Sequence, residues 1–70
     1  MPLSYTPNPA YREQVEAGDF AEERADDVYH FLHSMEQVVR DYEGKPMPSS
    51  VRDTIVRLES RLAWELGQPW

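Results

Sequence analysis

The feature that most constrains the fold is the position of the helix-breaking residues. Between Asp19 and Leu66, glycine and proline occur only in the segment Gly44-Lys45-Pro46-Met47-Pro48. Proline removes a backbone donor and clashes with the preceding turn, and glycine favours the end of a helix. Two uninterrupted segments therefore flank one short connection, which predicts two long helices joined as an antiparallel hairpin.

The first of these segments is predicted to form a helix over residues 20–43. Asp19, followed by Glu22 three residues later, has the spacing of a capping box at its start. At about 100° per residue the apolar side chains fall on one stripe over six turns. The stripe consists of Ala21, Ala25, Val28, Phe31, Leu32, Met35, Val38, Val39 and Tyr42. We expect Phe31, Leu32 and Met35 to be its most buried members.

The second segment is predicted to form a helix over residues 50–66. Ser50 with Asp53 has the spacing of another capping box. Its apolar stripe is narrower and consists of Val51, Ile55, Leu58, Leu62 and Leu66. Pairing outward from the turn brings two pairs of opposite charges together across the hairpin. These pairs are Asp41 with Arg52 and Glu36 with Arg57.

The N-terminal region is predicted to be an extended arm followed by a short helix. Asn8-Pro9 supplies an N-cap with proline at the first helical position. We expect an arm over residues 1–8 and a helix over residues 9–17 that ends at Gly18. The short helix should cover the excess length of the helix over 20–43, and Tyr5 and Trp70 should anchor the termini. The side chains expected to pack there are Tyr11, Val15, Phe20, Leu66 and Trp70.

Length and composition limit the class of protein. The 70 residues, of which 40% are apolar and 29% charged, suffice for one folded domain, which we place at residues 9–70. The chain has no cysteine, so no disulfide, thiol nucleophile or Cys-based zinc site is expected. It contains no catalytic triad spacing, phosphate loop or dinucleotide fingerprint. We therefore expect an all-α protein of three helices that is not an enzyme and binds no cofactor.

Charge is segregated along the chain, whose net charge is −6. Residues 1–43 carry ten acids and three bases (−7), and the remainder carries three acids and four bases (+1). This asymmetry attracts basic partners and disfavours nucleic acid and anionic membranes. Four acids at the start of one helix also exceed what its dipole requires. The residues predicted to bind a basic protein surface are Glu13, Glu16, Glu22, Glu23, Asp26 and Asp27, and the alternative is a surface that only aids solubility.

Two histidines form part of a polar helix face opposite the apolar stripe. Asp26, His30, His33 and Gln37 are spaced i, i+4, i+7 and i+11. An acid and a histidine one turn apart can share a metal. Because this face points to water in a single chain, a solvated polar surface is the leading interpretation. A metal site at His30 and His33 between two chains, or a pH-sensitive contact, is the alternative.

The helix over 50–66 has a second face that favours self-association. Small side chains recur there at helical spacing, which permits close approach of another helix. Trp64 lies beside them, and tryptophan on an outer face is enriched at interfaces. The predicted homodimer interface consists of Val56, Ser60, Ala63 and Trp64. In the alternative, Trp64 stacks on Arg57 or Arg61 as a cation–π pair or packs under the N-terminal arm.

These features predict a small acidic module that occludes a basic surface on a target protein. In composition alone, the chain is analogous to phage-type inhibitors such as anti-CRISPR or host-takeover proteins. The alternatives are an assembly subunit whose hairpin completes a larger helical bundle and a helical metal-binding protein. No apolar run approaches the ~20 residues of a membrane span, and no signal-like segment opens the chain. A cytoplasmic protein is expected, in a host's cytoplasm if a phage carries the gene.

Overall fold

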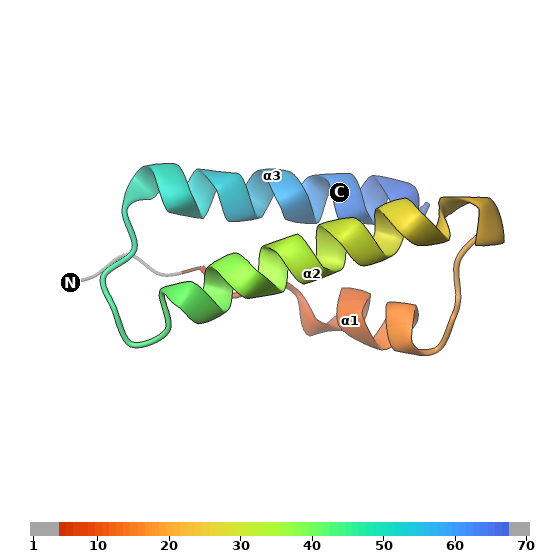
Figure 1. The fold of residues 1–70 in the computed structure, drawn as a ribbon, viewed down its shortest axis with the longest axis horizontal. Coiled ribbons are helices and arrows are strands. Elements are labelled where there is room, and N and C mark those ends of the chain that lie inside the picture. The colour runs from red at the N-terminus through yellow and green to blue at the C-terminus, as the bar shows by residue number, and fades with distance from the viewer. Residues whose placement is uncertain (1–4, 68–70) are drawn as a thin grey trace.

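A computed structural model describes residues 5–67 and shows three α-helices and one 3₁₀ turn, with no strand in that range. The elements are α1 (Pro9–Glu16), η1 (Glu22–Arg24), α2 (Ala25–Asp41) and α3 (Ser49–Glu65). Helices α2 and α3 run antiparallel, and α1 lies along α2 (Figure 1). The predicted all-α fold, with a short first helix and a long hairpin, is confirmed.

Local sequence signals fix both ends of α1. The side chain of Asn8 accepts a hydrogen bond of 3.0 Å from the backbone N–H of Ala10, and Pro9 occupies the first helical position. The C-cap is Ala17, and the next residue, Gly18, has a φ of 71°. This left-handed conformation is the one for which glycine is favoured after a helix. The helix therefore starts and stops where its capping residues require.

Helix α2 begins later than the sequence predicts. Instead of a helix from residue 20, the chain forms the 3₁₀ turn Glu22–Arg24, and regular α-helix starts only after it. Asp19 does not cap this helix, because its backbone completes the turn after α1. Its N–H donates to the carbonyl of Gln14 at 3.1 Å, and its own carbonyl accepts from the Gln14 side chain at 2.9 Å. Phe20 then packs against the core, so residues 18–21 form a loop.

The predicted capping box at the start of α3 is also wrong. The helix begins at Ser49 with Pro48 as its N-cap, and no side chain caps it. The carbonyl of Pro48 accepts the N–H groups of Val51 at 3.0 Å and Arg52 at 3.1 Å. Asp53 contacts the Arg52 side chain at 3.4 Å instead of completing the box. The proline-rich connection therefore starts this helix through its backbone.

The core lies along the seam between α2 and α3 and includes residues from α1 and the 42–48 connection. Its buried members are Val15, Val28, Leu32, Met35, Met47, Ile55, Leu62, Ala63 and Leu66. Leu32 and Met35 are buried as predicted, whereas Phe31 is only half-buried and Val28, with 0% exposure, takes its place. Tyr11 and Phe20 pack against the same cluster, as expected. Trp70 lies outside the described residues.

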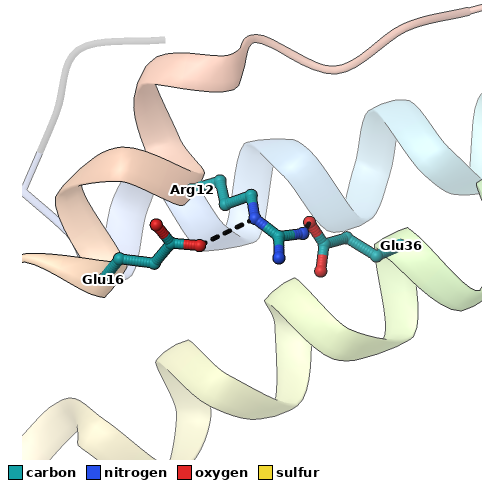
Figure 2. A network of polar contacts seen from close by, with 3 residues as sticks. All are labelled: Arg12, Glu16 and Glu36. Carbon is teal, nitrogen blue, oxygen red and sulfur yellow. Dashed lines mark hydrogen bonds and ion pairs between the residues drawn. The ribbon is translucent and has the colours of Figure 1, made fainter.

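An ion-pair network that the predicted hairpin pairing did not include joins α1 to α2. Glu36 was expected to meet Arg57, but it accepts a hydrogen bond from Nη1 of Arg12 on α1 (Figure 2). The Nε of Arg12 also lies 2.9 Å from Oε1 of Glu16. Hydrogen bonds to Glu16 and Glu36 raise the pKa of Arg12. Arg12 therefore links α1 to α2 through Glu36, while Glu16 holds its guanidinium from within α1.

The other predicted charge pair across the hairpin is also absent among residues 5–67. Asp41 was expected to meet Arg52, but it accepts from the side chain of Gln37 at 2.8 Å, within α2. Helices α2 and α3 have 17 residues each, and η1 extends the start of α2 by 3 residues, so the excess length is about one turn and not the expected two. Helix α1 covers the flank of α2 instead.

Candidate functional site

Seven acidic side chains gather at one end of the molecule, which we call the acidic end. They come from α1, the loop after it, η1 and the start of α2, which lie together in Figure 1. All seven are exposed, and they are Glu13, Glu16, Asp19, Glu22, Glu23, Asp26 and Asp27. Within the described part of the chain, Glu16 is the one member in an ion pair. The predicted binding residues are thus brought together with most of their charge uncompensated.

Arg24 is the single base within residues 13–27, and it is directed away from these acids. Its Nη1 donates to the backbone carbonyl of Trp64 at 3.3 Å, and its guanidinium lies 5.1 Å from the centre of the Trp64 ring. Both contacts tie η1 to the last turn of α3. In the sequence, the charge of Arg24 partly offsets the neighbouring acids. In the fold, its guanidinium instead holds η1 against α3.

Trp64 lies on the outer face of α3 and is 61% exposed. The guanidinium of Arg61 is 5.6 Å from its ring and 5.5 Å from the ring of Phe31. The cation–π alternative from the sequence is therefore present through Arg61 and Arg24, and it coexists with an exposed indole.

The small-residue face proposed for self-association is partly occupied within the chain. Ala63 is 0% exposed, so it is a core residue and not an available interface residue. Val56 and Ser60 are half-buried. The prediction placed Ala63 on the wrong side, since it is buried beside the core residues Leu62 and Leu66. Trp64 remains as the one exposed member of the set.

The polar face of α2 is exposed, as its spacing requires. His33 stacks on Tyr29 with ring centres 6.3 Å apart, and His30 meets Phe31 edge-on at 5.3 Å. Asp26 and Gln37 are exposed on the same helix. Within residues 5–67, no group of three or more histidine, aspartate or glutamate side chains is arranged to hold a metal. One chain therefore gives the metal alternative no support.

Glu59 is a candidate functional residue that the sequence patterns did not predict. It projects from α3 into the protein and is only 2% exposed. One carboxylate oxygen accepts from the hydroxyl of Tyr5, and the other accepts from the backbone N–H of Asn8 at 2.6 Å. The carboxylate therefore anchors residues 5–8, the described part of the N-terminal arm.

The contact with Glu59 changes the acidity of Tyr5. Burial, the hydrogen bond to Glu59 and the negative charge of Glu59 raise the pKa of Tyr5 to about 12. Tyr5 therefore stays protonated and remains a hydrogen-bond donor at neutral pH. The expectation that Tyr5 anchors its terminus is met through this donor.

No family model, curated protein or solved structure matches the chain. Within residues 5–67, no helix combines the length and the apolar character that crossing a bilayer requires.

Proposed function

We propose that this protein is a non-enzymatic binding module whose acidic end occludes a basic surface on a target protein. Its action would be that of a phage-type inhibitor, such as an anti-CRISPR or host-takeover protein, working in the cytoplasm. The observation that carries the proposal is the exposure of seven acids at one end, while Arg24 is held on Trp64. Complementary charge of this kind selects partners and speeds association.

The alternative, a surface that only aids solubility, needs no particular placement of the acids. Here the acids come from three consecutive elements that converge at one end (Figure 1). Glu22 and Glu23 lie in η1, and Asp26 and Asp27 lie in the first turn of α2, where part of their charge complements the helix dipole. The loop acid and the two acids on α1 have no such structural reason. Negative charge concentrated at one end favours recognition of a basic partner.

Charge reversal tests the proposal. Glu23→Lys with Asp26→Lys should retain the helical circular dichroism spectrum and lose capture of basic proteins from host lysate. Asp41→Lys with Asp53→Lys is the matched control, because it changes net charge equally and alters exposed acids away from the acidic end. Capture by the wild type should also weaken with salt, because exposed charges are screened beyond ~8 Å at physiological ionic strength. Equal capture by both double variants would overturn the proposal.

We also propose a homodimer that pairs the outer faces of α3. The exposed Trp64, flanked by half-buried Val56 and Ser60, supports it, whereas Ala63 no longer does. A two-fold pairing would bury Trp64 on both chains at once. Sedimentation of the wild type and of Trp64→Glu at tens of micromolar tests this. A monomeric wild type would show that the indole is only a cation–π partner of Arg24 and Arg61.

A further inference from the structure

A groove of about 730 Å³ lies at the other end of α2, away from the acidic end. One wall is the N-terminal arm, and the opposite wall is the C-terminal half of α2 with the connection to α3. Met35 and Met47, which also belong to the core, line it together with half-buried Val39 and Tyr42. This volume is within the ~300–1,000 Å³ of typical ligand sites, which are likewise mainly apolar.

The arm that forms one wall is held by a buried carboxylate. Glu59 places a carboxylate at a core position, and no cation accompanies it among the described residues. Glutamate is rarely buried without a cationic partner, and here its two oxygens are occupied by donors from the arm, which indicates a role in holding the arm. Its effect is to fix Tyr5 and the Asn8 backbone, both of which line the groove. The buried carboxylate therefore keeps the groove formed in advance of binding.

The net charge of the residues that line the groove is opposite in sign to the net charge of the whole chain. Its lining includes three cationic side chains, Arg12, Arg40 and Lys45, and two acidic ones, Glu36 and Glu43. Arg12 is already held by Glu16 and Glu36. Arg40 and Lys45 form no ion pair within residues 5–67 and outnumber the remaining acid, Glu43. The groove is thus a locally cationic site on a chain of net charge −6.

We propose that this groove binds an elongated apolar molecule that carries a single carboxylate. The apolar body would lie against Val39 and Tyr42, beside the buried Met35 and Met47, and the carboxylate would lie at the rim with Arg40 and Lys45. The carbonyl end of α2 adds about half a negative charge near Arg40, so the positive excess is small. This small excess favours a monoanion over a dianion such as a phosphate monoester. The site is separate from the acidic end and does not depend on the proposed function.

Decanoate is a suitable probe, and methionine methyl signals in NMR report on the site. Decanoate added to the full chain should shift the methyl signals of Met35 and Met47 in a saturable manner. The indole N–H signal of Trp64, at the far end of α3, should not move. Lys45→Glu and Arg40→Glu should each weaken binding by roughly three- to ten-fold, since each loses an attraction and gains a repulsion. Arg57→Glu is the matched control, because it makes the same charge change on an exposed position of α3 and should have no effect.

Three comparisons decide the details. Decanamide, which lacks the charge, should bind more weakly than decanoate, and equal binding would overturn the role of Arg40 and Lys45. Glu59→Leu changes no residue that lines the groove, so weaker decanoate binding by this variant would show that the anchored arm keeps the groove formed. Glu59→Gln serves as a second variant if the first does not fold. Unchanged binding by the folded variant would overturn the anchoring argument. Tighter binding of a leucine-ending peptide than of decanoate would overturn the proposed occupant in favour of a protein C-terminus, and shifts that do not saturate would overturn the site.

Discussion

Replacing Tyr5 with phenylalanine removes one of two donors to the buried carboxylate of Glu59. A hydrogen bond to a charged group contributes about 1.5–3 kcal/mol, and the carboxylate has little access to water that would replace it. A domain of this length has a total stability on the order of 4–10 kcal/mol. The substitution should therefore remove a large part of the stability and lower the Tm by roughly 6–24 °C.

A double-mutant cycle measures whether this loss comes from the Tyr5–Glu59 contact. Urea and thermal unfolding, followed by far-UV circular dichroism, would be recorded for Tyr5→Phe, Glu59→Leu and the pair. Without the carboxylate, Tyr5→Phe should cost under about 0.5 kcal/mol, which gives a coupling energy of about 1 kcal/mol or more. Glu59→Leu should also speed hydrogen exchange at the Asn8 amide, which loses its acceptor. An equal cost of Tyr5→Phe in both backgrounds would refute the anchoring role of Glu59.

Two further outcomes follow from burial and from the pKa of Tyr5. Leu62→Ala, at a position of 0% exposure, should lower the free energy of unfolding by about 2–5 kcal/mol, measured by chemical unfolding. Phe31→Ala should lower it by less, because Phe31 is half-buried. The reverse order would contradict the core assignment. The pKa of Tyr5 rises from 10.0 in the unfolded chain to about 12 in the fold. The folded chain therefore keeps a proton that the unfolded chain loses, so stability should be complete below about pH 10 and fall toward pH 12. This fall should be smaller in Tyr5→Phe, and identical alkaline unfolding profiles would contradict the contact.

The hairpin could be predicted because its determinants are local in sequence. The helix-breaking residues between Gly44 and Pro48, and the apolar stripes at helical spacing on either side, suffice to define two antiparallel helices. The capping boxes failed although they are local, because backbone hydrogen bonds took over their role. The backbone of Asp19 completes the turn after α1, and the carbonyl of Pro48 accepts the first N–H groups of α3. A capping motif alone therefore does not fix where a helix begins.

The anchored arm depends on contacts that no local pattern reveals. One signal was present, since Glu59 lies between Ile55 and Leu62 on the apolar stripe of α3, where a carboxylate is rarely buried without partners. That spacing indicates a buried acid, but it does not name the donors. Tyr5 and Asn8 are 54 and 51 residues away in the chain. Arg24 shows the same limit, because only the fold brings it to Trp64.

The two proposed sites lie at opposite ends of α2, and this separation makes them independent. Asp26 and Arg40 are fourteen residues apart on the helix, which is roughly 21 Å at 1.5 Å per residue. This is more than twice the ~8 Å screening length at physiological ionic strength. Arg12 connects the two regions, because it lines the groove and contacts Glu16, but two carboxylates already hold its charge. Glu23→Lys with Asp26→Lys should therefore leave decanoate affinity unchanged, and an altered affinity at physiological salt would show that the network around Arg12 couples the two ends.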